Sequence, residues 1–184
     1  MQQTWEQLLW TPHTARTTIA NSATEAILVP NATVFANTLY AGGALRCWGY
    51  GAYGTTTGPP NLQFRVRWGG VAGTIIAATS NIATTASTGG GASMTNLLEW
   101  DFTVQCRTAG SSGSVFTNGR VTLWTSATAA TVYALASGST GGTTPAAVTV
   151  DTTTDQALAV TAQWGTANAA NSVAGDQRYD SSLN

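Results

Sequence analysis

Several segments of the chain alternate between apolar and polar residues. The clearest is Leu98–Arg107, in which every second side chain from Leu98 to Cys106 is apolar and the side chains between them are polar. Leu62–Trp68 and Leu158–Trp164 follow a similar pattern. Because successive side chains of a strand point to opposite faces, each segment predicts an antiparallel strand with one buried and one solvated face.

Shorter segments predict further strands, and glycine-rich turns separate them. The dipeptide Asn118-Gly119 predicts a tight hairpin between two of them. Residues 79–95 carry few large side chains and predict a long connection with room for one short helical turn. Roughly ten short strands without a helical pattern predict an all-β sandwich or barrel, as one domain over residues 17–184. The shorter segments are 17–20, 25–29, 44–53, 74–78, 114–116, 120–125, 131–135 and 147–150.

Residues 1–16 differ from the rest and predict an N-terminal arm or anchor. Trp5, Leu8 and Leu9 are spaced as on one face of a helix, and Pro12 would end that helix. So short a helix is marginal in water unless it packs on a surface. The arm therefore either packs on its own domain or docks on a neighbouring subunit or partner, and its apolar residues, Trp10 included, are the candidate contacts.

The composition limits the classes of partner that the chain is expected to bind. Only 8% of the residues are charged, the net charge is -1, and all seven basic residues are arginine. Binding to nucleic acid needs clustered positive charge, so it is not expected. No apolar stretch is long enough to span a membrane, and the first residues do not resemble a secretory signal. A surface with so little charge favours association, so we expect the chain to work in an assembly.

The candidate chemistry is sparse. His13 is the only histidine and lies in the arm, where solvation or packing is the simpler interpretation. Glu99 and Asp101 share one strand face at a separation compatible with glycoside hydrolysis, but that face is expected to be solvated, which disfavours a general acid. Residues 151–155 have alternating oxygens that could suit calcium, yet a turn with Asp side chains bonded to backbone amides is preferred. We expect no catalytic residue, cofactor or metal site.

Two groups of side chains leave alternatives open. Cys47 and Cys106 both fall at apolar strand positions, so two buried free thiols are favoured over a disulfide. Among the aromatic residues Trp48, Tyr50 and Tyr53, at least one is expected to face outward. Such a side chain can serve a subunit interface, which is favoured, or a platform for a glycan.

Five stretches share a loose pattern of threonine, glycine and aromatic residues: Asn37–Arg46, Leu62–Gly70, Thr149–Thr153, Leu158–Trp164 and Gly165–Ser172. In this pattern the chain resembles the small jelly-roll proteins on virions of tailed bacteriophages, over roughly residues 17–175. The resemblance implies an antiparallel jelly-roll-like sandwich of about 8–10 strands without an active site. It also implies a head decoration (cement) protein, or a module of a tail fibre or head fibre, commonly a trimer. The arm has no counterpart in it.

Residues and resemblance together predict a non-enzymatic virion structural protein, assembled in the host cytoplasm. The main expectation is a capsid decoration protein that binds a phage head as an oligomer, expected to be a trimer, through contacts with the major capsid protein. The alternative is a receptor- or glycan-binding module of a fibre, with Trp48, Tyr50 and Tyr53 as its aromatic residues.

Overall fold

The computed structural model describes residues 7–8, 15–56, 58, 60–86, 94–126, 128–138 and 144–183. Within these ranges the chain forms fourteen strands and no helix, which confirms the predicted all-β class. The strands are β1 (Gln7–Leu8), β2 (Thr17–Ala20), β3 (Ala26–Ile27), β4 (Ala32–Val34), β5 (Ala44–Gly54), β6 (Asn61–Trp68), β7 (Thr74–Ala78), β8 (Ile82–Ala83), β9 (Asn96–Thr108), β10 (Gly113–Ser126), β11 (Ala129–Ser137), β12 (Val148–Val150), β13 (Gln156–Trp164) and β14 (Ser172–Leu183).

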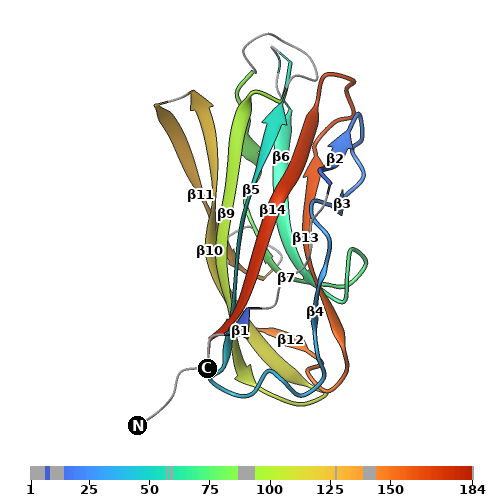
Figure 1. The fold of residues 1–184 in the computed structure, drawn as a ribbon, viewed down its shortest axis with the longest axis vertical. Helices are drawn as coiled ribbons and strands as arrows, with labels where there is room; N and C mark the ends of the chain where they lie inside the picture. The colour runs from blue at the N-terminus through green and yellow to red at the C-terminus, as the bar shows by residue number, and fades with distance from the viewer. Residues whose placement is uncertain are drawn as a thin grey trace.

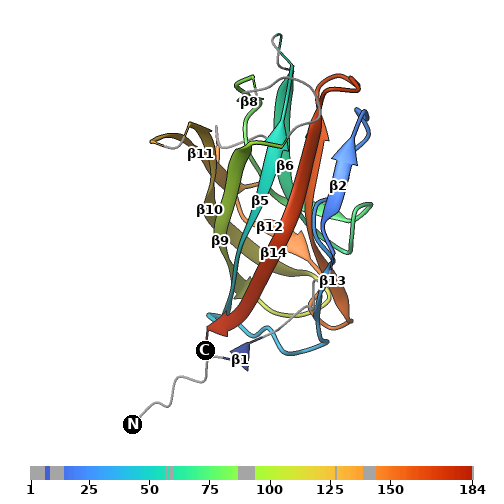
Figure 2. The same ribbon diagram turned by 45° about the horizontal axis from the view of Figure 1, so that its top comes forward.

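The strands of the described residues pair antiparallel in one sheet. Its main path runs β1-β14-β5-β9-β10-β11-β7-β6-β13-β3, and β2, β4, β8 and β12 pair beside this path with β14, β13, β6 and β10. The sheet folds back on itself, so that β14, β5, β9 and β10 form one layer and β7, β6 and β13 the other (Figures 1 and 2). The result is the expected jelly-roll-like sandwich, nearly closed.

The core lies between these layers, and the alternating segments supply it. In β9, Trp100 and Phe102 are fully buried, while Glu99 and Asp101, which alternate with them, are only partly buried. Phe64 of β6 and Trp164 of β13 enter from the opposite layer. The strands predicted from alternation are therefore confirmed, because the period of two that buries one face is the property by which they were found.

The predicted hairpin at Asn118-Gly119 is wrong. Both residues lie inside β10, which pairs with β9 on one side and β11 on the other. Gly119 is needed there because a β-carbon would overlap Phe102 and the Asp101 carbonyl oxygen of the neighbouring strand. Glycine inside a strand can mark such a close approach of backbones as well as a turn. The hairpin lies further on, between β10 and β11.

The long C-terminal strand β14 is absent from the sequence prediction. It pairs with β5 along nearly its whole length, from Ser172 opposite Gly54 to Leu183 opposite Ala44. A break in register between Gly175 and Gln177 interrupts its alternation, and charged residues follow at positions that face the interior. The short strands β4 and β8 were missed as well, and β8 lies in the expected connection 79–95. The described residues of that connection form no helical turn.

Of the N-terminal arm, the structure describes the backbone of Gln7 and Leu8, and residues 15–16, of which Arg16 forms an ion pair with Asp176. Gln7 and Leu8 form strand β1, paired with Ser182 and Ser181 of β14, so the expected helix is wrong at these two positions. Trp5, Leu9, Trp10 and His13 lie outside the described residues.

Candidate functional site

The candidate site is the outer face of the layer formed by β14, β5, β9, β10 and β11, meaning the side chains of these strands that do not enter the core. The strand register orders this face in rows. Tyr179 of β14 lies opposite Trp48 of β5, and Trp48 lies opposite Asp101 of β9. Asp101 in turn lies opposite Arg120 of β10. Residues far apart in the sequence therefore form one continuous surface.

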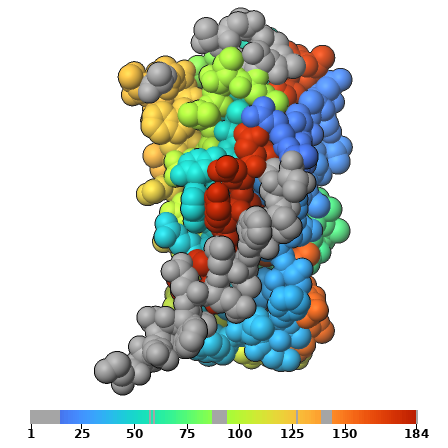
Figure 3. All heavy atoms as spheres, in the orientation of Figure 1, coloured from blue at the N-terminus to red at the C-terminus, as the bar shows by residue number. Residues whose placement is uncertain are grey.

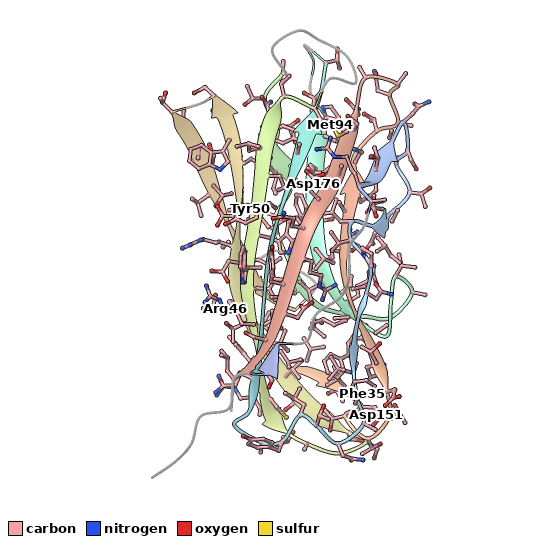
Figure 4. The ribbon with its side chains drawn as sticks, in the orientation of Figure 1. Phe35, Arg46, Tyr50, Met94, Asp151 and Asp176 are labelled. Carbon is pink, nitrogen blue, oxygen red and sulfur yellow. The ribbon has the colours of Figure 1, made fainter. Side chains whose placement is uncertain are left out.

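Three aromatic side chains cluster on the outer face. The rings of Trp48 and Tyr179 stack at 4.3 Å between centroids, with 19° between their planes. Tyr50 meets Trp48 edge-on, at 5.4 Å and 84°. Tyr50 is 43% exposed, and Figure 4 shows it on β5 with Arg46. The aromatic trio, as we name Trp48, Tyr50 and Tyr179, is held rigidly because stacked and edge-to-face pairs have favourable energies.

Charged groups flank the aromatic trio. Arg46 donates two hydrogen bonds to Asp101, from Nε at 3.1 Å and from Nη2 at 3.0 Å. This bidentate geometry fixes both side chains across β5 and β9. A shallow hollow of about 540 Å³ lies around the pair, lined by Arg46, Asp101, Thr103, Asn118, Arg120 and Leu183.

The structure corrects one predicted site residue and adds another. Tyr53 is fully buried, and its hydroxyl donates to the Trp124 carbonyl at 3.3 Å, so it cannot belong to an exposed platform. Its position differs from those of Trp48 and Tyr50 by an odd number of residues, which places its side chain on the opposite face of β5. The third aromatic residue of the exposed cluster is instead Tyr179, which stacks on Trp48. Tyr179 was not among the predicted residues, because β14 itself was not predicted.

The carboxylate pair Glu99 and Asp101 lies on the outer face of β9, as expected. Both residues are partly exposed. Asp101 accepts two hydrogen bonds from the Arg46 guanidinium, so both of its carboxylate oxygens are engaged within the chain. This arrangement favours a structural ion pair over a proton donor.

A fully buried ion pair lies behind the outer face, inside the sandwich. Arg178 donates from Nε and Nη2 to the two carboxylate oxygens of Asp180, at 2.7 and 3.0 Å. Its Nη1 donates to the carbonyl oxygens of Pro30 and Leu158, at 3.1 and 3.0 Å. The side chains are 0% and 3% exposed. Arg178 thus links β14 to the backbone of β13 and of the segment before β4. These elements lie at the other end of the strand order, so this contact helps to close the sheet.

Cys47 lies directly opposite Asp180 in the strand register. Burial, together with the nearby Asp180, raises the pKa of the Cys47 thiol, against the opposing charge of Arg178. Burial also raises the pKa of the Cys106 thiol. Both cysteines are buried and free, as predicted, and the neutral thiol is the favoured form of each.

The opposite layer carries a second polar cluster around Glu25. Arg65 and Arg67 both bind this carboxylate, at 2.5 Å each, and Thr161 donates its hydroxyl to it at 2.5 Å. Arg65 also donates to the amide oxygens of Gln63 and Gln163. A hollow of about 490 Å³ lies beside these amides, lined by Asn61, Gln63, Asn81 and Gln163 among others. The cluster cross-links strands β6 and β13 to the segment before β3.

This cluster makes stability depend on pH. Burial alone would raise the pKa of Glu25, but hydrogen bonds from Arg67 and Thr161 and the charges of Arg65 and Arg67 outweigh it, so the pKa is lowered. A lowered carboxyl pKa contributes stability above the unfolded-state value of about 4.3, and this contribution is lost as pH falls through the folded-state pKa.

We therefore expect Glu25→Gln to lower the free energy of unfolding by about 1 to 2 kcal/mol at pH 7. This cost lies between those of losing an exposed and a fully buried ion pair. The difference from wild type should shrink as the pH falls below about 4. Urea denaturation at pH 7 and at pH 3 measures this. Asp176→Asn, in the more exposed pair with Arg16, is the control and should cost less than about 1 kcal/mol. A cost for Glu25→Gln that does not change with pH would contradict the assignment.

The segment 151–155 forms the predicted turn. Asp151 accepts hydrogen bonds from the Thr153 backbone amide at 2.7 Å and from the Thr153 hydroxyl at 2.6 Å. These bonds lower the pKa of Asp151. Asp155 accepts from the Ala36 amide at 2.8 Å, which ties the turn to the loop of Phe35 at the same end of the molecule (Figure 4).

The described residues contain no group of three or more His, Cys, Asp or Glu side chains placed to hold a metal ion. They also contain no helix with the length and apolar character needed to cross a membrane.

Comparison with known proteins identifies no family for this chain: no protein-family model and no curated protein sequence matches it.

Proposed function

We propose that the protein is a non-enzymatic structural component of a virion, most specifically a capsid decoration protein that binds a phage head as an oligomer. The observation that carries the proposal is an outer face on which arginine and aspartate are paired while apolar side chains stay exposed. Such a face favours association with other proteins over a chemical reaction.

The pairing of charges supports this function. Arg16, Arg46, Arg65, Arg67 and Arg178, five of the seven arginines, take part in ion pairs within the chain. Arg107 lies over the ring of Phe116, at 5.2 Å from its centroid. These arginine side chains are engaged by groups of the chain itself, and a net charge of -1 gives little electrostatic repulsion between copies.

Exposed apolar side chains on the same face support it further. Tyr50, Leu97 and Val132 are 43%, 61% and 60% exposed, and they come from β5, β9 and β11 of one layer. Removal of apolar surface from water is the main favourable contribution to association. On a shell, the same contact recurs at every subunit, and bridging neighbouring coat proteins stabilises the shell by mass action.

The experiment is reconstitution. Heads are isolated from particles whose genome lacks this gene, the purified protein is added, and occupancy is measured by gradient sedimentation and cryo-electron microscopy. Saturable binding at symmetric positions, commonly as trimers, is the expected result. Heads that leave the protein unbound at all concentrations would overturn the proposal. A variant without residues 2–12 tests the arm: it should stay folded but lose binding, and unchanged occupancy would remove the arm's role.

The aromatic trio favours a second candidate, a glycan-binding module of a fibre. Trp48, Tyr50 and Tyr179 lie together beside the Arg46–Asp101 pair and the neighbouring hollow, and aromatic rings next to polar groups suit a neutral sugar ring and its hydroxyls. A glycan array decides this. Specific capture that is lost on Trp48→Ala, and kept on Phe35→Ala at the exposed loop, would favour it. Absence of capture would leave the decoration function as the single candidate.

A further inference from the structure

Strand β11 has an unpaired edge. On one side it pairs with β10 from Ala129 to Ala136. On the other side β7 pairs with it only at Ala136 and Ser137. Among the described residues, no strand pairs with this second edge before Ala136. Figures 1 and 3 show this part of β11 at the margin of the molecule.

The direction of the backbone groups along this edge follows from one hydrogen bond. The amide of Gly138 donates to the carbonyl of Ile76 at 3.0 Å, so the backbone groups of Gly138 point towards the segment of β7. In an antiparallel strand this direction repeats at every second residue. The amides and carbonyls of Ala134, Val132 and Ala130 therefore point the same way, beyond the last paired residue of β7.

Such an edge is a template for another strand. Soluble proteins usually protect a free edge with charged side chains, proline or a bulge. From Ala129 to Ser137 the strand has no charged residue and no proline, and its register with β10 is regular from Ala130 to Ala136. Val132, at the centre of the free edge, is 60% exposed. Nothing within this strand therefore disfavours addition of a strand.

We propose that this edge pairs with the same edge of a second copy, antiparallel about a two-fold axis at Val132. Residues with outward backbone groups must face one another, so Val132 lies opposite the partner's Val132 and Ala130 opposite the partner's Ala134. Any register that moves the axis towards Ser137 would require Ala136, whose backbone groups already bind β7. The register centred on Val132 uses all three free residues of both edges.

The side chains of this strand suit a second copy as the occupant. The strand is uncharged, so two copies do not repel each other there. Thr131 would lie opposite the partner's Tyr133, and pairs of β-branched with aromatic side chains are favourable across strands. The contact is short compared with a standard interface, so a weak dimer is expected in solution. On a surface that presents many copies, the same contact would strengthen through effective concentration.

This contact deepens the proposed function and rests on it for its biological role, since it would connect neighbouring copies or trimers on a shell. Its test needs only the purified chain. Sedimentation velocity from about 10 µM to about 1 mM should show a concentration-dependent dimer contact in the wild type. Val132→Lys and Val132→Glu each place like charges opposite one another and should raise the dissociation constant at least about tenfold. An equimolar mixture of the two variants should restore association, because opposite charges then face each other.

Gln105→Lys, at an exposed position on the outer face of β9, is the matched control and should associate as the wild type does. Thermal melting of each variant shows that the sandwich is intact. Three results would overturn the proposal: a wild type that shows no such contact at any concentration, Val132 variants that associate unchanged, or a mixture that fails to recover. None of them depends on particle binding, so this inference and the decoration function can fail separately.

Discussion

Asp180→Ala should lower the free energy of unfolding by about 3 to 5 kcal/mol, the cost of leaving a buried charge without its partner. Asp180 accepts both the Nε and Nη2 bonds of Arg178, whose side chain is 0% exposed. Without the carboxylate, the guanidinium keeps only the carbonyls of Pro30 and Leu158. Carbonyls offset part of the desolvation but supply no net negative charge. Urea denaturation of the purified protein measures the loss.

Two further variants make this prediction specific to the buried pair. Asp176→Ala removes the carboxylate from the exposed pair with Arg16 and should cost less than about 1 kcal/mol. Arg178→Met combined with Asp180→Leu should be less destabilised than Asp180→Ala alone, because apolar replacement of a whole buried pair is often neutral. A loss below about 1 kcal/mol for Asp180→Ala, or a double variant as unstable as the sum of its parts, would refute the argument.

Gly49→Ala should cost about 3 kcal/mol, at the upper end of the range for overpacking a core. A β-carbon at this position would overlap the ring of Trp100 and the Gln177 carbonyl oxygen. Trp100 is 1% exposed and cannot move outward, and the carbonyl belongs to the paired backbone of β14. The substitution therefore forces apart either the two strands or the core.

Gly165→Ala is the matched control, because a β-carbon there would make only ordinary contacts with Asn61. It should change the unfolding free energy by less than about 0.5 kcal/mol. The midpoint of urea unfolding, compared at constant slope, measures both variants. Equal effects at positions 49 and 165 would mean that the space beside Trp100 does not limit stability.

The predictable part of this fold is the part in which each strand has one polar and one apolar face. β6 and β9 carry that alternation in their own residues, and their ends were predicted to within a few positions. The Glu25 cluster was not predictable, because it joins side chains of β6 and β13 to the segment before β3, and the tertiary fold sets which of these lie side by side. Asn118-Gly119 shows the opposite problem: a dipeptide typical of turns serves a close strand contact that only the position of Phe102 explains.

The candidate site was predictable only in part, for the same reason. Trp48 and Tyr50 were correctly placed together by their spacing on one strand. Tyr53 was assigned to the wrong side because two glycines obscure the alternation before it. Tyr179 required knowledge that β14 lies beside β5, a pairing across most of the chain length that local patterns do not encode.

The position of β14 also has a consequence for how the chain folds. β14 comes last along the chain among the described strands, yet it occupies the interior of the sheet, next to β5 from the first third of the sequence. Until β14 pairs, one side of β5 lacks its neighbouring strand, and Arg178 cannot bond to the carbonyls of Pro30 and Leu158. Contacts this distant in sequence slow folding and lengthen the exposure of unpaired strands. The pairing of β14 with β5 is therefore expected late in folding, and the chain is most prone to aggregation before this pair forms.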